Sequence, residues 1–204
     1  GYVLQSDILI EFLTVKETLQ FGANLKIKGT EEQKQQRADK LISEFKLEGT
    51  ENTLVGGQFV KGISGGQKKR VNIALELISD PPVLFLDEPT SGLDSYTSEI
   101  VIKKLDELAK QFNKTIIYVI HQPSSDIFKQ MDKLMLLYKG KTIYYGGAGQ
   151  TAVDYFGKIG FKCETDMNPS DFFMYIMQSK NQELGSYLDT NYLDKVGVVI
   201  DSKR

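Results

Sequence analysis

The chain has 204 residues, with 25 Lys or Arg against 27 Asp or Glu, which leaves a net charge of −2 at pH 7. A hydrophobic share of 41% is enough to form a buried core, and the near-neutral charge argues against a protein dedicated to binding nucleic acid. A single cysteine and a single histidine exclude an internal disulfide, a cysteine-based zinc site and a multi-histidine metal site. No apolar run approaches the ~18 residues of a membrane-spanning helix.

The N-terminal part of the chain has the pattern of a helical region. Residues 14–17 and 30–33 each have a threonine followed three positions later by Glu or Gln, which is the spacing of a capping box at a helix start. Apolar residues at i, i+3, i+4 and i+7 over 38–45 predict one buried helix face. We therefore expect residues 6–80 to be largely helical and to end at Pro81-Pro82.

The middle of the chain alternates predicted strands and helices. Short unbroken apolar runs at 83–86 and 115–120 are typical of strands buried on both faces, and 134–138 is a third run. Helices are predicted between them, at about 95–112 and 124–131. This order predicts a parallel α/β sheet.

The remaining segments are weaker signals. Lys139-Gly140 predicts a hairpin between 134–138 and 142–145. Residues 150–178 are predicted as two short helices around a break at Asn168-Pro169, and the tail, 181–204, is polar and weakly patterned.

Polar side chains follow two of the predicted strands. Asp87 and Glu88 come directly after the run at 83–86, and His121 ends the next strand. Ligands of open α/β sheets bind at such strand ends, where an Asp can hold Mg²⁺ and an adjacent Glu can act as a general base. Taken alone, two solvated acids and a histidine bonded to backbone would explain these residues equally well.

A third feature is the segment Ser64-Gly65-Gly66-Gln67. Ser64 and Gln67 have capping-box spacing, and the two glycines leave the first N–H groups of the predicted helix open to an anion such as phosphate. A glycine-rich turn before a helix is the plainer explanation. We interpret the basic residues that follow, 68–70, as a solvated helix face.

The order of these motifs resembles the nucleotide-binding domain of ATP-binding cassette (ABC) transporters. Ser-Gly-Gly-Gln precedes a strand that ends in Asp-Glu-Pro-Thr-Ser-Gly-Leu-Asp, and a later strand ends in His. Residues 1–5 resemble the family's Q-loop. The segments 53–57, 120–124 and 168–172 resemble the G subfamily, the White and pleiotropic-drug-resistance group, whose members export lipids, sterols, pigments or drugs.

The resemblance implies a fold and a domain order. The fold is an α/β parallel sheet of the P-loop NTPase (RecA-like) type with an ABC helical subdomain, incomplete at the N-terminus. Residues 1–5 would be the end of a core strand and the Q-loop, and 6–80 the helical subdomain ending in the signature motif, Ser64-Gly65-Gly66. Residues 81–165 would be the core, and 166–204 an extension towards the membrane domain.

The resemblance also implies roles in binding ATP and in pairing. Ser64, Gly65 and Gly66, with Gln67 behind them, would contact the γ-phosphate of an ATP that is held mainly by a second nucleotide-binding domain. Asp94 would lie at the interface between the two domains, and a transmembrane domain of the same parent chain would be the other partner. The domain would lie on the cytoplasmic side of the membrane.

The remaining residues would carry out hydrolysis. Asp87 would support Mg²⁺ through water, and Glu88 would polarise the attacking water. His121 would contact the γ-phosphate, while Gln5 would sense Mg²⁺ and couple the site to the membrane domain.

One expected motif is absent from the sequence. No G-x-x-x-x-G-K-[ST] loop occurs, and in the family that loop lies upstream of the Q-loop. We therefore expect the chain to be a piece of a longer protein that begins inside a domain. Two alternatives stay open: a soluble ABC protein that acts on ribosomes or nucleoprotein, and a truncated, non-catalytic partner that supplies only the signature motif.

Overall fold

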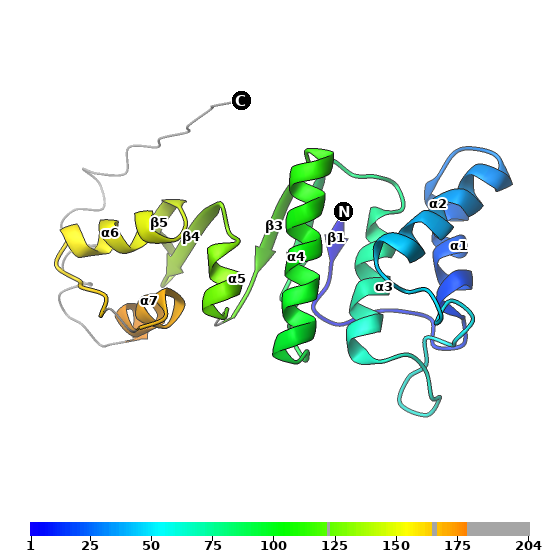
Figure 1. Cartoon of the computed structure of the whole chain (residues 1–204), viewed down its shortest axis with the longest axis horizontal. Coiled ribbons are helices and arrows are strands. Elements are labelled where there is room, and N and C mark those ends of the chain that lie inside the picture. The colour runs from blue at the N-terminus through cyan, green and yellow to red at the C-terminus, as the bar shows by residue number, and fades with distance from the viewer. Residues whose placement is uncertain (122, 165–166, 179–204) are drawn as a thin grey trace. The chain divides into compact units, whose positions relative to one another are not determined.

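The computed structural model describes residues 1–121, 123–164 and 167–178, so the predicted tail at 181–204 lies outside the described residues. The chain forms two compact units, which divide after His121 (Figure 1). The domain boundaries after residues 5, 80 and 165 were drawn from the family resemblance and not from compactness, and they stay a prediction. Within the described part, no helix is both long enough and apolar enough to cross a membrane.

A three-stranded parallel sheet organises the first unit. Its strands are β1 (Tyr2–Val3), β2 (Val83–Asp87) and β3 (Thr115–Val119), in the order β1-β2-β3. The pairs Phe85–Tyr2 and Asp87–Val119 fix the register. Parallel pairing across the predicted runs confirms the α/β sheet and brings the carboxyl ends of the three strands to one edge.

Four helices accompany this sheet. They are α1 (Val15–Lys26), α2 (Glu31–Glu44), α3 (Gly65–Leu77) and α4 (Ser95–Phe112). All three predicted capping boxes form, at the starts of α1, α2 and α3. Helices cover only about half of the region predicted as largely helical, because an irregular segment joins α2 to α3. Helix α3 also ends before the prolines, since the chain turns at Asp80, which has a φ of +54°.

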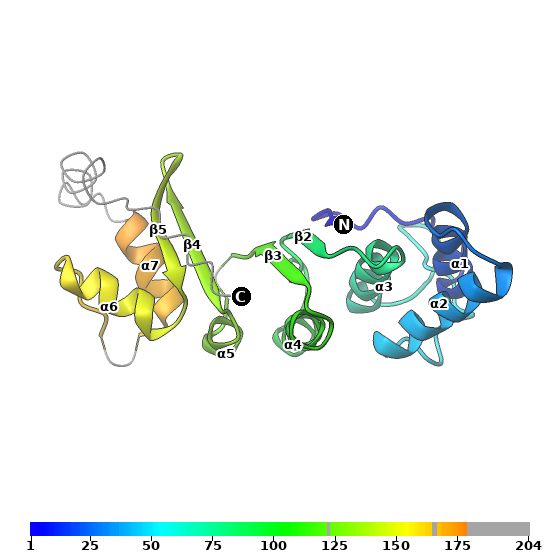
Figure 2. The same ribbon diagram turned by 90° about the horizontal axis from the view of Figure 1, so that it is seen from above.

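One face of the sheet is covered and the other is open. Figure 2 shows α3 and α4 on the same side of the strands, where Leu84 and Leu86 are buried. On the opposite side Phe85, Ile117 and Val119 are 44%, 47% and 58% exposed. The prediction that β2 and β3 are buried on both faces is therefore wrong for the described chain, because its helices pack against one face only.

The second unit is a hairpin with three helices. Strands β4 (Lys133–Tyr138) and β5 (Lys141–Gly147) pair antiparallel, which confirms the predicted hairpin. The run at 134–138 was expected to extend the parallel sheet, but among the described strands β4 pairs with β5. The tight turn at Lys139-Gly140 makes that local pairing geometrically simple.

The helices of the second unit enclose a largely aromatic core. They are α5 (Ser125–Lys129), α6 (Gln150–Lys158) and α7 (Pro169–Gln178), so Pro169 begins a helix, as its fixed φ favours. The buried core comprises Phe128, Ile143, Tyr144, Ala152, Phe156, Phe172, Phe173 and Ile176. Two predicted motifs meet beside it, because Asn168 Nδ2 and Ser170 Oγ both donate to the Pro123 carbonyl, at 3.2 and 2.8 Å.

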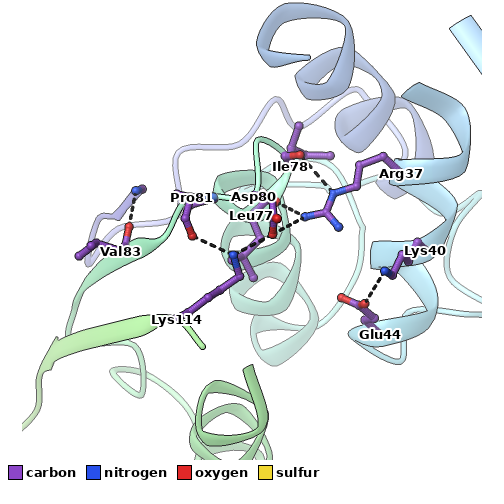
Figure 3. Close-up of polar contacts among 10 residues, drawn as sticks. Arg37, Lys40, Glu44, Leu77, Ile78, Asp80, Pro81, Val83 and Lys114 are labelled. Carbon is purple, nitrogen blue, oxygen red and sulfur yellow. Dashed lines mark hydrogen bonds and ion pairs between the residues drawn. The ribbon is translucent and has the colours of Figure 1, made fainter. Parts of the chain in front are cut away.

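Asp80 joins three elements of the first unit at the start of β2. Its carboxylate accepts from Lys114 Nζ at 2.7 Å and lies 3.5 Å from the guanidinium of Arg37 (Figure 3). Arg37 extends from α2 and also donates to the carbonyls of Leu77 and Ile78, at the end of α3. The hydrogen bond from Lys114 is the main reason that the pKa of Asp80 lies below its usual value, although burial opposes this shift.

We predict that Asp80→Asn lowers the free energy of unfolding at pH 7 by about 1 kcal/mol. This is the size expected for an ion pair at the surface, since the Asp80 side chain is 69% exposed. A carboxyl whose pKa falls on folding contributes stability above its unfolded pKa of about 3.9, and this stability is lost as the pH drops through the folded value. The difference from wild type should therefore be constant above about pH 5 and shrink below about pH 4 in urea titrations. The matched control Glu107→Gln, in the partly exposed i,i+3 pair Lys104–Glu107 of α4, should change stability by less than about 0.5 kcal/mol.

Candidate functional site

Glu88 occupies an unusual position at the end of β2. Asp87 is the last residue of the strand, and Glu88 follows it with a φ of +46°, in the left-handed region. Its N–H donates to the Val119 carbonyl at 3.0 Å, and its own carbonyl accepts from Ser91 N at 3.0 Å. A non-glycine residue in this conformation costs about 1 kcal/mol or more, so the surrounding bonds hold Glu88 in a turn that it does not favour by itself.

The carboxylate of Glu88 lies between the residues that follow the two neighbouring strands. Gln5 Nε2 donates to Oε2 at 2.6 Å, and His121 Nε2 lies 3.0 Å from Oε1. Gln5 follows β1 and His121 follows β3, so the parallel register brings all three side chains together. The Glu88 side chain is 21% exposed and that of His121 is 72% exposed, which leaves the cluster accessible from solvent.

The segment Ser64–Gln67 forms the start of α3, as the sequence predicts. Ser64 Oγ accepts from Gln67 N at 3.3 Å, and Ser64 N donates to Gln67 Oε1 at 2.8 Å. A Cβ added at Gly65 would meet nothing within 4 Å, whereas one at Gly66 would overlap Thr97 Cγ2. Gly65 therefore leaves open space at the helix N-terminus, and Gly66 allows α3 to pack closely against α4.

Asp94 is the N-cap of α4. Its Oδ1 accepts from Thr97 N at 2.9 Å, and its Oδ2 accepts from the Thr97 hydroxyl at 2.7 Å. These bonds, the one from the Thr97 backbone N–H first, hold the pKa of Asp94 below its usual value. Because Thr97 also faces Gly66, the start of α4 and the start of α3 share one contact point.

The predicted site residues thus form two groups. Gln5 and His121 each contact Glu88, the residue after Asp87, while Ser64–Gln67 and Asp94 are linked through Thr97. In the described part of the chain, no three His, Cys, Asp or Glu side chains cluster as a ready-made metal site. Asp87 and Glu88 are the two carboxylates at the end of β2, and Mg²⁺ is usually held by one or two carboxylates together with waters and substrate phosphates.

The basic residues after the signature glycines do not form a solvated face, and that interpretation was wrong. Lys68 donates to the Gly56 carbonyl at 2.7 Å, and Arg70 donates to the Phe45 carbonyl at 2.8 Å. Lys69 is 2% exposed and pairs with Asp7 at 2.8 Å. The burial of Lys69 was not predicted from the sequence. Asn72 and Ile73 lie three and four residues after Lys69, so the three residues share the buried side of α3.

A partial match to the phosphate-binding loop lies elsewhere. Gly140-Lys141-Thr142 has the last three residues of the G-x-x-x-x-G-K-[ST] pattern, but Met135 stands where its first glycine would be. The structure places these residues at the turn and start of β5, not between a strand and a helix. The Gly-Lys-Thr segment therefore has the wrong local structure for a phosphate loop.

Two family profiles match the chain. One described as ABC transporter matches residues 1–91, and one described as ABC-2 type transporter matches residues 121–192. The first covers the sheet strands β1 and β2 with α1–α3, and the second covers the helices and hairpin of the second unit.

Several curated proteins are similar over most of this chain. The broad substrate specificity ATP-binding cassette transporter ABCG2 of Bos taurus is 49% identical over 179 residues, which are 87% of this chain and 27% of that protein. ABC transporter G family member 22 of Arabidopsis thaliana is 48% identical over 176 residues, which are 85% of this chain and 23% of that protein. The chain thus spans about a quarter of the length of these relatives.

Solved ABC cassettes share the fold. A dimeric ATP-binding cassette, MJ0796, in a post-hydrolysis state with ADP and Pi, matches with a TM-score of 0.60 and 29% identity. The match covers 72% of this chain and 62% of that one. A second dimeric structure of the same bacterial cassette matches with a TM-score of 0.59 and 28% identity, over the same shares of the two chains.

We predict different outcomes for the two signature glycines in the 204-residue chain. Gly66→Ala should lower the free energy of unfolding by about 1–3 kcal/mol, because the new methyl group overlaps Thr97. Gly65→Ala is the matched control and should leave it unchanged or raise it by less than about 1 kcal/mol. Both values come from urea titrations.

A second-site change separates this overlap from a general intolerance of Ala at residue 66. Thr97→Ser removes Cγ2 but keeps the hydroxyl that bonds Asp94. Added to Gly66→Ala, it should recover most of the lost stability. If the double variant is as unstable as Gly66→Ala alone, the contact with Thr97 does not explain the need for glycine.

Proposed function

Because this chain belongs to the ABC transporter family, with relatives in its G family, we propose that it carries the signature helix and hydrolytic residues of a nucleotide-binding domain. In the intact protein that domain hydrolyses ATP and drives export across a membrane. The observation that carries the proposal is the Glu88 carboxylate held between Gln5 and His121 at the edge of a parallel sheet.

Glu88 acts as the general base in this proposal. A base must be held within hydrogen-bond reach of the water that it activates, and contacts on either side of the carboxylate restrict its rotation. Asp87, at the strand end, supports Mg²⁺ through water. When bound, Mg²⁺ neutralises the negative charge that develops on the phosphates. His121 is exposed enough to reach a phosphate oxygen and is held in place by Glu88.

The signature segment serves a nucleotide held mainly by a second domain. Ser64 caps α3 and the open space beside Gly65 lets an anion approach the helix N-terminus, where backbone N–H groups and the helix dipole favour negative charge. Asp94 lies at the interface between the two domains. The dimeric form of the similar solved cassette supports a paired arrangement.

The proposed location is the cytoplasmic side of a membrane, with a transmembrane domain in the same protein. The ABC-2 match over residues 121–192 supports a membrane exporter over a soluble ABC protein that acts on ribosomes or nucleoprotein. For the exported compound we propose a lipid, sterol, pigment or drug-like molecule. The broad substrate specificity in the name of the Bos taurus relative supports this range.

We predict that Glu88→Gln in the intact protein abolishes steady-state ATP hydrolysis but keeps ATP binding. The amide can still accept a hydrogen bond from Gln5, but it cannot take a proton from water. Loss of a general base should lower kcat by about 10²–10⁴-fold. Phosphate release and nucleotide binding measure the two effects separately, and hydrolysis at the wild-type rate would remove Glu88 from the role of base.

We also predict that the 204-residue chain alone binds Mg·ATP weakly and does not turn it over measurably. Its sequence has no G-x-x-x-x-G-K-[ST] loop, whose backbone N–H groups and lysine would hold the phosphates. Isothermal titration should therefore give no micromolar binding. A micromolar affinity would mean that the residues present form a cradle of another kind.

A further inference from the structure

Lys69 is a charged side chain enclosed by protein. It extends from the second turn of α3 and is 2% exposed. A buried ammonium group is costly unless it is paired and hydrogen-bonded, so its acceptors show what holds it in place. Both acceptors belong to the segment that follows β1.

The first acceptor is the carboxylate of Asp7, at 2.8 Å. Asp7 also accepts a hydrogen bond from Asn72 Nδ2, one turn further along α3, at 2.8 Å. Asp7 therefore retains a partner on α3 when Lys69 is absent. The ion pair by itself is explained by stability and requires no role in the site.

The second acceptor is the backbone carbonyl of Gln5, to which Lys69 Nζ donates at 2.8 Å. The side chain of this same residue donates to Glu88 Oε2 at 2.6 Å, and Glu88 Oε1 lies 3.0 Å from His121 Nε2. A continuous path of contacts thus runs from α3 through Gln5 to Glu88 and His121. The path starts at Lys69, which lies five residues after Ser64, the N-cap of the same helix.

We propose that Lys69 is a positioning residue for the hydrolytic site: by fixing the Gln5 backbone to α3, it directs the Gln5 amide onto Glu88. The inference rests on the proposed function, since it concerns how the ATPase residues are aligned. The described bonds of Lys69 go to Gln5 and Asp7 and not to Ser64–Gln67, so Lys69 acts on the site through Gln5. It also ties the position of Gln5 to the helix whose N-terminus faces the partner's nucleotide.

Three variants separate this role from simple stabilisation. Lys69→Met keeps the side-chain length and removes the donor to Gln5. Asp7→Asn removes the ion pair but keeps an oxygen near Lys69 and leaves the bond to the Gln5 carbonyl intact. Lys26→Met is the matched control, because Lys26 pairs with Glu76 of α3 at 2.8 Å and has no contact with Gln5 among its described bonds.

The first readout needs no nucleotide. His121 is the single histidine of the sequence, so a chain labelled with ¹⁵N-histidine gives one set of ring resonances. Lys69→Met should shift these resonances, because Glu88 loses the support of Gln5 and changes its contact with His121. Lys26→Met and Asp7→Asn should leave them close to wild type. Unshifted resonances in a folded Lys69→Met chain would overturn the inference.

The second readout is ATP hydrolysis by the intact protein. Lys69→Met should lower kcat by about 10- to 100-fold, the usual effect of losing a group that orients a functional side chain, with KM for ATP changed less than about twofold. Asp7→Asn should keep kcat within about threefold although it lowers stability. If kcat falls equally in both variants, in proportion to their stability, Lys69 is only structural.

The outcomes also distinguish this inference from the proposed function. If Glu88→Gln abolishes hydrolysis and Lys69→Met does not slow it, the ATPase assignment stands and the role of Lys69 is wrong. If wild type does not hydrolyse ATP, the proposed function fails, whatever the ring resonances show. Should Lys69→Met not fold, Lys69→Leu removes the same donor with a shorter apolar side chain, and unshifted His121 resonances in a folded Lys69→Leu chain would likewise overturn the inference.

Discussion

Parallel pairing of β1, β2 and β3 is the constraint on which the hydrolytic cluster depends. Each strand contributes one residue just beyond its carboxyl end, and the register sets Gln5, Glu88 and His121 around a single carboxylate. A shift of one residue in any strand would turn its side chain to the other face of the sheet. The cluster therefore requires the whole sheet to form in one register, and the bond from Glu88 N to the Val119 carbonyl ties the left-handed turn at Glu88 to that register.

Helix α3 gives the second group of residues its position. Its capping box fixes where the helix begins, so Ser64 and the two glycines occupy defined places in the first turn. Gly66 then allows close approach to Thr97, and Thr97 holds the carboxylate of Asp94 at the start of α4. The distance between the N-termini of α3 and α4 thus depends on the close approach of Gly66 to Thr97. A larger residue at 66 would separate them, whereas the open side at Gly65 stays available to an anion.

The sequence was sufficient where the signal is local or periodic. Capping boxes at Thr14, Thr30 and Ser64, the hairpin turn at Gly140 and the strand at 83–86 depend on neighbouring residues, and the structure confirms them. Side chains whose partners lie far along the chain could not be predicted in this way. Lys69 looks like a solvated residue in a basic run, and only the fold shows that Asp7 and Gln5 lie beside it. The exposed face at Phe85 depends on which helices cover the sheet, and strand periodicity does not supply that information.

The three basic residues 68–70 of α3 bond to three different segments of the chain. Consecutive residues on a helix project about 100° apart, so Lys68, Lys69 and Arg70 point in three directions around the axis. Each reaches a backbone carbonyl of a different segment: Gly56 before the signature, Gln5 after β1, and Phe45 after α2. Rotation of α3 about its own axis would break at least one of these bonds. These bonds attach α3 to three separate segments of the chain, so Gln5 is held to the same helix that carries Ser64 and the two glycines.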